Sequence, residues 1–497
     1  FYWGLENKLQ FNPSKSQAML ITRRRKVEVN TSLQMHGHDI ELVNSLNYLG
    51  VVLDKKLTFR PHFEHLASKS SKFLRGLSLA SRPTWGLNSE ILKIIYHGAI
   101  KPLLLYCASA YEHVLNKKYA QKKLSQVQRG FALLICKGYR TLSTDAALVI
   151  AGIPPLYLSG LYSAGVSDIK RKRKNNFQNC TFDCDYTMPF LAAGHPAVQY
   201  DDLYIKYCDN VHTYNIYTDG SRFTEGNEVQ VGCAYVVYCK NSEVFFKLFK
   251  LSPRSTVFQA ELYAIKEAVQ WCLERKHSAR IFSDSQAALQ SIADKYNLNS
   301  TSVQIRNNIK EHTAHVCLGW IRGHQGNVGN ERADQLAKSA ASSGLQYSFN
   351  KCPISYVKRE ILNYIFNSWN DLWTRSENGA LTKDLFFPTI HSRLITKHFT
   401  PNFILTQFMS GHGKFGTYFR RFNVNTDYNY HCKCQESTQS VKHILFDCPI
   451  FSRQRLWLNL LLSDCDYSYS RLFGKIFQNQ CYYKQFMQFI TNIHKHV

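Results

Sequence analysis

Four acidic residues stand in short motifs whose residue types and spacing could hold metal ions. Asp219 closes a β-rich run in the string YTDGS, and Asp284 closes a later one in FSDSQAAL. Glu261 falls in a stretch with helical spacing, and Asp334 opens the last helix expected in this part of the chain. Strand ends and helix faces are rigid mounts, which suits ligands that must be held within fractions of an ångström. The sequence therefore predicts four carboxylates that converge on one site.

Converging carboxylates would support the hydrolysis of a phosphodiester. Two divalent cations roughly 4 Å apart neutralise charge on both the attacking and the leaving oxygen. Mg²⁺ prefers oxygen ligands and keeps several waters, so a few carboxylates suffice. Without metal the carboxylates would repel one another, which raises some of their pKa values. A single acid is usually a solvated surface group, and only the joint placement of the four overrules that interpretation.

A histidine lies in the glycine-rich loop 322–327, directly before the helix that carries Asp334. Imidazole titrates near neutral pH, so His324 could transfer a proton in such a site. A histidine with a purely structural place in the loop is the alternative.

The elements that must position these residues follow from the pattern of apolar and β-branched side chains. Three β-rich runs come first, two of them separated by the turn-like Lys240-Asn241-Ser242. Helices and further strands then alternate, which implies a mixed sheet packed by helices. The expected strands are residues 214–218, 231–238, 244–251, 279–282 and 316–321, and the expected helices are residues 256–274 and 328–340.

The strings YTDGS, QAELYAI, FSDSQAAL and GHQGNVGNERADQLA occur in this order, and together they resemble the ribonuclease H family. The resemblance implies an α/β fold, a five-stranded mixed sheet with flanking helices, and two bound Mg²⁺ or Mn²⁺ ions. Asp219 would bridge both ions, and Asp334 would help to hold the ion that activates water. Glu261 and Asp284 would hold the ion at the leaving group. His324 would serve proton transfer or product release.

The implied substrate is an RNA–DNA hybrid. Selectivity for a hybrid rests on 2′-hydroxyl contacts in the minor groove. Gly220, Gln259 and Ser285 lie beside the acids in the sequence and could supply such contacts. Small polar residues at strand and helix ends are more often caps, which is the alternative.

The N-terminal flank resembles the end of a reverse transcriptase. Residues 9–19 (LQFNPSKSQAM) look like the segment that follows the catalytic palm, and residues 48–54 (YLGVVLD) look like a primer-grip strand. The helical stretch after them would be thumb-like, with an unrelated α/β segment as the alternative. A polymerase also needs upstream palm aspartates in a Tyr-x-Asp-Asp turn. Tyr200-Asp201-Asp202 lies downstream and lacks the spacer residue, so we read it as an acidic turn and expect no DNA synthesis.

A Cys/His cluster near the C-terminus has metal-ligand spacing. Cys432 and Cys434 are followed after eight residues by His443, and after four more by Cys448. Three thiolates and an imidazole form a closed tetrahedral zinc shell, although His443 and Cys448 would need a turn between them. The order resembles the zinc knuckle that ends many non-LTR retrotransposon polyproteins, where its role would be nucleic-acid grip. Free buried cysteines are the alternative, and His431 is a possible substitute ligand.

The charge balance favours a polyanionic partner. Lys and Arg number 61 against 36 Asp and Glu, a net charge of +25, and such an excess is typical of nucleic-acid binding. A membrane surface is the rival, but no run of 18 uncharged apolar residues is present. Fifteen cysteines, mostly single within apolar runs, indicate a reducing compartment and an intracellular protein, in the nucleus or the cytoplasm. The start at Phe1 suggests a piece of a longer polypeptide.

The order of these parts resembles the C-terminal part of a non-LTR, Jockey-like retrotransposon polyprotein. A mostly helical region would precede the nuclease, and a helical tail with the zinc knuckle would follow it. The basic run 170–174 could be a solvated face, a nucleic-acid contact or an import signal. The expected domains are a palm remnant with its primer-grip-like strand (1–55), a thumb-like region (56–170), a basic and polar linker (171–212), the ribonuclease H domain (213–345), a helical region (346–425), the knuckle (426–455) and a tail (456–497).

Three functions are compatible with this organisation. The first is a metal-dependent endonuclease that cuts the RNA strand of RNA–DNA hybrids and leaves 5′-phosphate and 3′-hydroxyl ends, as the family does. The second is a nucleic-acid-binding remnant whose nuclease is inert. The third is a cellular ribonuclease H with fused binding domains, against which the palm-like start and the knuckle argue. The sequence leaves the oligomeric state open.

Overall fold

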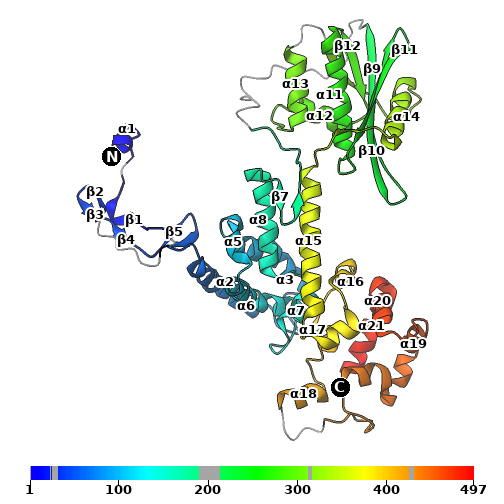
Figure 1. Cartoon of the computed structure of the whole chain (residues 1–497). Coiled ribbons are helices and arrows are strands. Elements are labelled where there is room, and N and C mark those ends of the chain that lie inside the picture. The colour runs from blue at the N-terminus through cyan, green and yellow to red at the C-terminus, as the bar shows by residue number, and fades with distance from the viewer. Residues whose placement is uncertain are drawn as a thin grey trace. The chain divides into compact units, whose positions relative to one another are not determined.

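The computed structural model of the chain forms two compact units, each described by itself below (Figure 1). The first, here the helical unit, joins Phe1–Gly165 with Leu362–Val497, and the second, here the sheet unit, comprises Val166–Ile361. The structure describes residues 2–9, 11–22, 24, 32–189, 213–311, 316–424 and 430–496. Tyr200-Asp201-Asp202 therefore lies outside the described residues.

The sheet unit contains a six-stranded mixed sheet in the order β13-β12-β9-β10-β11-β14. The strands β9, β10 and β11 form an antiparallel meander, and β12, β13 and β14 join it in parallel. The strands are β9 (Tyr214–Glu225), β10 (Glu228–Cys239), β11 (Ser242–Leu251), β12 (Ala279–Ser283), β13 (Val316–Trp320) and β14 (Tyr347–Phe349). The helices are α11 (Val257–Arg275), α12 (Gln286–Ala293), α13 (Ser300–Glu311) and α14 (Val328–Ser342).

The sheet is buried on both faces because side chains alternate along β10. Val231, Cys233, Tyr235 and Val237 contribute to one core cluster together with residues of α11, α12 and β12. Ala234 and Val236, which alternate with these residues along β10, belong to a second, smaller core cluster together with residues of α14. In Figure 1, α11 and α14 accordingly lie on opposite sides of the sheet. Gly232 allows α14 to approach closely, since a Cβ atom there would lie 2.3 Å from the backbone nitrogen of Ala341.

The expected fold class is confirmed, with two differences in detail. The sheet has a sixth strand, because Tyr347–Phe349 pairs with β11 where a helical tail was expected to begin. The first strand continues to Glu225, so Asp219 lies in the middle of β9 and not at its end. The length of β9 follows from its ladder with β10, which pairs every residue from Tyr214 to Glu225.

A buried arginine holds the loop between α12 and α13 in the sheet unit. The Arg306 side chain is 1 % exposed, and its guanidinium donates to the carbonyl oxygens of Ser291, Ile292, Asp294 and Asn297. These groups include carbonyls at the C-terminus of α12, which lack partners within the helix.

Replacing Arg306 with Met should therefore destabilise the sheet unit by about 3 kcal/mol, because four carbonyl groups lose a charged donor. Urea unfolding followed by tryptophan fluorescence measures this change. Arg275→Met is the control, since that side chain is 43 % exposed and should cost less than about 1 kcal/mol. Equal losses for the two variants would contradict the role of Arg306.

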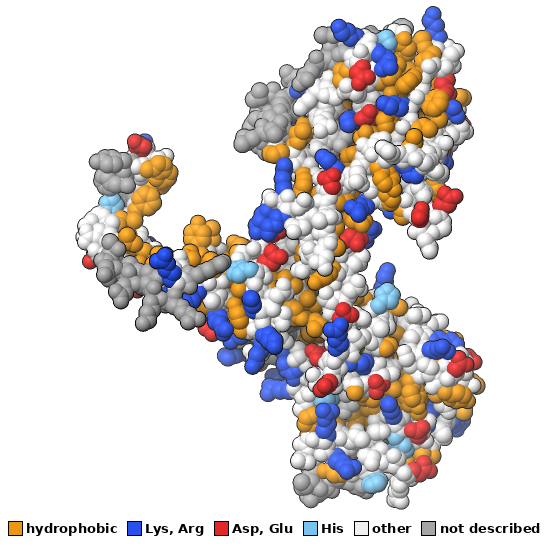
Figure 2. Space-filling model, viewed as in Figure 1, with side chains coloured by type: hydrophobic (Ala, Val, Ile, Leu, Met, Phe, Trp, Pro, Cys, Tyr) orange, Lys and Arg blue, Asp and Glu red, His pale blue; other side chains and the backbone are white. Residues whose placement is uncertain are grey.

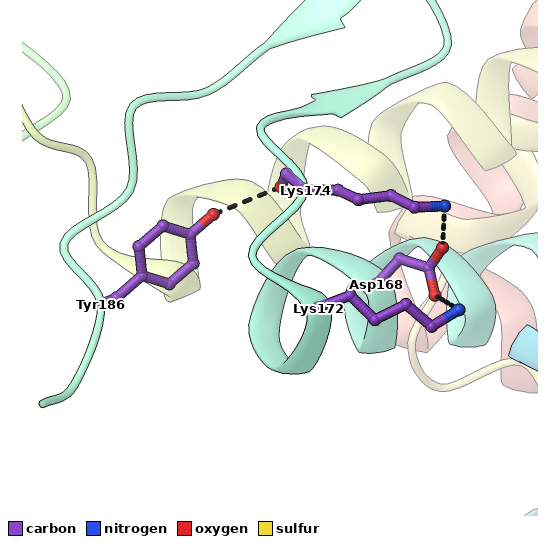
Figure 3. A network of polar contacts seen from close by, with 4 residues as sticks. All are labelled: Asp168, Lys172, Lys174 and Tyr186. Carbon is purple, nitrogen blue, oxygen red and sulfur yellow. Dashed lines mark hydrogen bonds and ion pairs between the residues drawn. The ribbon is translucent and has the colours of Figure 1, made fainter. Parts of the chain in front are cut away.

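The basic run 170–174 lies at the end of α8 (Leu156–Lys172) and in the two residues that follow this helix. The Asp168 carboxylate forms ion pairs with Lys172 at 2.6 Å and with Lys174 at 2.5 Å. The Tyr186 hydroxyl donates a hydrogen bond to the Lys174 carbonyl oxygen (Figure 3). The Asp168 side chain is only 5 % exposed. Two of the lysines in the run 170–174 are thus partly neutralised within the fold. Beyond them, β7 (Asn176–Phe177) pairs with β8 (Cys180–Thr181).

The helical unit begins with small strand pairs and continues as packed helices. The hairpin of β5 (Ser45–Tyr48) and β6 (Val51–Asp54) turns through Leu49 and Gly50, which both have positive φ. The first part contains α1 (Tyr2–Glu6), η1 (Pro13–Lys15), β1 (Gln17–Ala18), β2 (Gln34–Met35), β3 (His38–Asp39), β4 (Glu41–Leu42), β5 (Ser45–Tyr48), β6 (Val51–Asp54), α2 (Arg60–Ala80), α3 (Ser89–Ile95), η2 (Tyr96–Ile100), α4 (Lys101–Leu104), η3 (Ala108–Ala110), α5 (Glu112–Leu115), α6 (Lys118–Cys136) and α7 (Thr144–Ala151).

The C-terminal part of the helical unit packs aromatic side chains between its helices. Phe386 and Phe473 lie with ring centroids 4.3 Å apart, and Phe477 joins them. Its elements are α15 (Ile354–Arg375), which starts in the sheet unit, then η4 (Thr382–Phe386), α16 (Ile390–Ile395), α17 (Phe403–Ser410), α18 (Gly416–Phe422), η5 (His443–Asp447), η6 (Pro449–Phe451), α19 (Ser452–Ser463), α20 (Tyr469–Gln478) and α21 (Gln480–His494).

One helical stretch, Ser89–Ala110, is long and apolar enough to cross a membrane by length and composition. The pair Thr144–Ala151 and Leu156–Lys172 would qualify only as a span bent by 58°. Within the helical unit, however, Leu92, Tyr96 and Ile100 of the first stretch belong to the buried core. A core helix has the same composition, so nothing further follows about membranes.

Candidate functional site

Three of the four predicted carboxylates meet in the sheet unit. One ligand oxygen from each of Asp219, Glu261 and Asp284 lies within 4.8 Å of the others. Asp219 comes from the middle of β9, Glu261 from the first turns of α11, and Asp284 from the residue after β12. Asp219 and Glu261 are 7 % and 5 % exposed, so both carboxylates are largely withdrawn from water.

The local fold explains why these residues meet. The strand β12 runs parallel to β9 and pairs Ser283 with Thr218, so Asp284 and Asp219 follow one another on adjacent strands. Gly220 lies directly under α11, since a Cβ atom there would be 2.7 Å from the backbone nitrogen of Glu261. The glycine in YTDGS thus lets the helix settle on the strand beside Asp219.

The electrostatics of this carboxylate cluster favour a bound cation. Burial, followed by the nearby Asp284 and Asp334, raises the pKa of Asp219 to about 7. Burial and the charges of Asp219 and Asp284 raise the pKa of Glu261 well above its ordinary value. In the described part of the chain, Glu261 Oε2 is also buried without a hydrogen-bond partner. Divalent cations would supply both the missing charge and the missing partner.

Asp334 lies beside the cluster, outside the group of three. It sits in the second turn of α14, because the helix begins at Val328 with Asn327 as its N-cap, so Asp334 does not open the helix as expected. Its carboxylate forms an ion pair with Lys338 at 2.7 Å, and its side chain is 27 % exposed. The charge of Asp334 still raises the pKa of Asp219, which places it close to that residue.

The loop and the strand next to the cluster hold Asp284 in place. The Trp320 indole donates to the Asp284 backbone oxygen at 3.1 Å, and the Asn330 amide donates to Asp284 Oδ2 at 3.4 Å. Gly323 passes against the same carboxylate, since a Cβ atom there would lie 2.7 Å from Oδ2. Sequence reasoning missed the contributions of Trp320 and Asn330, although the four-residue spacing of Asn330 and Asp334 on one helix face was a usable signal. His324 follows Gly323, exposed and with a φ of 55°.

The three residues expected to touch nucleic acid all have structural partners. Gly220 is covered by α11, and Ser285 caps α12 by accepting from the Ala288 backbone. The Gln259 side chain forms a capping box with Thr256 and donates to Asp185 at 2.9 Å. Capping was the alternative interpretation for these residues, and their contact with nucleic acid stays a prediction.

A basic pocket, which sequence reasoning missed, lies at the N-terminus of α11. Its volume is about 250 Å³, and no acidic residue is among those that line it. The Ser255 hydroxyl in its wall is buried without a hydrogen-bond partner in the described part of the chain. Three arginines from separate segments line the pocket, namely Arg222 of β9, Arg254 and Arg359 of α15, together with Tyr356, Thr256, Val257, Pro253, Pro353 and Ser355. Backbone N–H groups at a helix start and arginines form a site for anions.

The four predicted zinc ligands also meet, in the helical unit. One ligand atom from each of Cys432, Cys434, His443 and Cys448 lies within 4.8 Å of the others. The Cys432 and Cys448 sulfurs are 3.6 Å apart, and Cys434 Sγ is 3.2 Å from His443 Nε2. Zn–S bonds of 2.3 Å in a tetrahedron place sulfurs about 3.8 Å apart, so the sulfur pair fits a zinc ion. His431 lies outside this Cys₃His cluster and bridges to Thr438.

The turn that the spacing required is a π-helical turn. His443–Asp447 form it, and the Cys448 backbone nitrogen donates to the His443 carbonyl at 2.7 Å, five residues back. The wider turn carries Cys448 round to the side of the imidazole, which an α-helix would not do. The Cys432–Cys434 side is closed by a tight loop in which the Cys432 nitrogen donates to the Ser437 carbonyl at 2.8 Å.

The mixed sheet, the helices on both faces and the carboxylate cluster at its centre define a ribonuclease H fold. Residues 212–342 match the RNase H family model. The chain is 28% identical over 176 residues to a retrovirus-related Pol polyprotein from the type-1 retrotransposable element R1 2 of Nasonia vitripennis, covering 34% of this chain and 43% of that protein. It is 29% identical over 142 residues to a ribonuclease H of Cupriavidus necator, covering 26% of this chain and 94% of that protein.

Two solved structures are also similar to part of the chain. The solution structure of the PFV RNase H domain is 19% identical, with 27% of this chain and 96% of that chain covered and a TM-score of 0.24. An RNase H from the archaeon Halobacterium salinarum is 21% identical, with 26% and 96% covered and a TM-score of 0.22.

The resemblance to the C-terminal region of a non-LTR retrotransposon polyprotein, with its RNase H domain, is confirmed by these relatives. The chain spans less than half the length of the first curated relatives that it matches, with 43% and 17% of two R1 Pol polyproteins covered. The polymerase-end and knuckle assignments of the flanks stay predictions.

Proposed function

We propose that the sheet unit hydrolyses the RNA strand of RNA–DNA hybrids with two divalent metal ions, Mg²⁺ or Mn²⁺. The observation that carries this proposal is the meeting of the Asp219, Glu261 and Asp284 oxygens within 4.8 Å. The match of residues 212–342 to the RNase H family supports the reaction type. Two buried carboxylates and a half-buried one without a cation are costly to a fold, and a functional ligand accounts for them.

The donor set fits hard cations, because it offers only oxygens, and one of them, Glu261 Oε2, has no hydrogen-bond partner among the described residues. Asp219, Glu261 and Asp284 would hold the ions, and the partly exposed Asp334 would contribute a fourth carboxylate beside them. When bound, the ions neutralise charge on the attacking and leaving oxygens and supply an activated water. The chain's own part is to fix the carboxylates between β9, α11 and β12, where their burial and mutual repulsion favour a bound cation. His324, exposed beside Asp284, exchanges a proton with the product phosphate.

The substrate proposal rests on charge as well as on the cluster. The net charge of +25 suits a polyanion. In the sheet unit, the basic pocket at the start of α11 would bind a backbone phosphate of the hybrid. In the helical unit, Lys and Arg side chains gather over α2 and α6 in Figure 2, and such a surface suits the same class of partner.

A hybrid-cleavage assay with a labelled RNA strand tests the proposal, run with Mg²⁺ and with a chelator. We expect Mg²⁺-dependent products with 5′-phosphate and 3′-hydroxyl ends from the hybrid, and none from duplex DNA. Hybrid binding with a steep salt dependence but no product would overturn the enzyme proposal. It would instead favour an inert nucleic-acid-binding remnant, in which the Asp334–Lys338 ion pair persists.

The basic pocket yields its own prediction. Arg254→Ala and Arg359→Ala should each weaken hybrid binding and reduce the slope of log K against log salt by about 1, because each removes one phosphate contact. Lys358→Ala is the matched control, since Lys358 is exposed on α15 next to Arg359 but does not line the pocket. Fluorescence anisotropy at several salt concentrations measures the slopes. Slopes equal to that of Lys358→Ala would exclude the pocket from the interface.

We also propose that the Cys₃His cluster binds one structural zinc ion. The proposal is supported by the sulfur separation of 3.6 Å between Cys432 and Cys448 and by a donor set that fills all four positions. A filled shell has no open position for substrate, so the site stabilises the fold and presents its surroundings to nucleic acid. We further propose a palm remnant and thumb-like region at 1–170, no DNA synthesis by this chain, and an intracellular location. Primer-extension assays test the second of these statements.

A further inference from the structure

One arginine beside the Cys₃His cluster, Arg455, is buried at the start of α19. Arg455 is 3 % exposed, and among the described residues no carboxylate lies within ion-pair distance of its guanidinium. It also lies in the first turn of α19, at the positive end of the helix dipole, where a cation is unfavourable. A buried charge without an ion pair costs several kcal/mol, and a nearby anion would offset that cost.

The neighbour of Arg455 is the cluster. Its Nη2 donates to the Cys448 backbone oxygen, and its Nε is buried without a partner in the described part of the chain. The other charged residues around the cluster, Lys433, Glu436 and Asp447, are exposed to solvent. Water can screen those charges, whereas it cannot reach Arg455.

The charge of a loaded cluster supplies what Arg455 lacks. A Zn²⁺ ion with three thiolates and one neutral imidazole carries a net charge of −1. We propose that Arg455 is the positioning counter-cation of this Zn(Cys)₃(His) anion and sets its affinity for zinc, with Nε directed to a ligand thiolate. The inference rests on the zinc site proposed above and assigns a new role to a residue outside the ligand set. It also links metal loading to the packing of α19, because the anion would offset the buried charge at the helix start.

Zinc affinity of the full-length protein tests this role, measured by competition with a chromophoric chelator. Arg455→Met removes the charge at similar volume and should weaken zinc binding by about 10- to 100-fold, the usual effect of losing a group that supports metal ligands. Arg455→Lys keeps the charge and should stay within about threefold of wild type. Arg393→Met is the matched control, because Arg393 is also buried in the helical unit and donates to the Ile150 carbonyl, away from the cluster.

Substitution of Co²⁺ for Zn²⁺ adds a spectroscopic measurement, which would not change if Arg455 only supported the fold. Arg455→Met should shift the thiolate-to-cobalt charge-transfer band, and Arg393→Met should leave it in place. Wild-type zinc affinity in Arg455→Met would overturn the counter-cation role, as would an Arg455→Lys protein as weak as Arg455→Met. Failure of the wild-type chain to bind zinc or cobalt at all would remove the zinc site and this inference together.

Discussion

Asp219→Asn is expected to lower the rate of hybrid cleavage by about 10³-fold or more, because it removes one of the three clustered carboxylates. Asp219 lies on β9, which packs against the helix that carries Glu261 and pairs with the strand that leads to Asp284. Single-turnover cleavage of a labelled hybrid measures the loss. Asp294→Asn is the control, since that acid lies in the loop after α12, outside the cluster, and should cleave at the wild-type rate.

The same substitution should stabilise the metal-free protein, which separates loss of chemistry from loss of fold. The pKa of Asp219 is raised from 3.8 to about 7, so between these values the folded state holds a proton that the unfolded state has released. Folding stability therefore falls as pH rises from about 4 to 7, and the penalty is complete above 7. Asparagine carries no such penalty. In chelator at pH 8 we expect Asp219→Asn to be more stable than wild type by on the order of 2 kcal/mol. A less stable variant would contradict the buried-charge account.

Cys448→Ser is expected to abolish tight zinc binding, with a loss in affinity of more than about 100-fold, since one of four closed-shell ligands disappears. Cys448 also ends the π-helical turn that begins at His443, so the loss should loosen the start of α19. Zinc content after dialysis and the thermal transition measure the two effects. Cys481→Ser is the control, because Cys481 is an exposed thiol on α21. Equal zinc content in the two variants would contradict the cluster.

The parts of the fold that sequence reasoning reached are those with a local signal. The β-rich runs and the helical spacing around Glu261 placed three carboxylates on their correct elements. The hairpin at Lys240 and Asn241 followed from its turn chemistry, and both residues have positive φ. The sequence pattern placed Asp219 at the end of its strand. Gly220 instead makes room for α11 over a strand that continues.

The rest depends on contacts between distant segments, which leave no local pattern. The strand β14 forms only because β11 offers a free edge to Tyr347–Phe349. The basic pocket needs β9, the start of α11 and α15 together, and no motif joins Arg222 to Arg359. Ligand spacing predicted the Cys₃His cluster, but the π-helical turn that closes it depends on hydrogen bonding within the fold.

Counting bound Mn²⁺ ions tests the carboxylate cluster most directly. Zinc-loaded full-length protein would be titrated with Mn²⁺ while bound to a hybrid whose RNA strand carries non-cleavable linkages, and the free ion would be followed by electron paramagnetic resonance. We expect two tight ions in the wild type, and loss of tight binding in Asp284→Asn, whose carboxylate meets those of Asp219 and Glu261 within 4.8 Å. Tight Mn²⁺ binding that is the same in wild type and Asp284→Asn would contradict a metal site at these three residues.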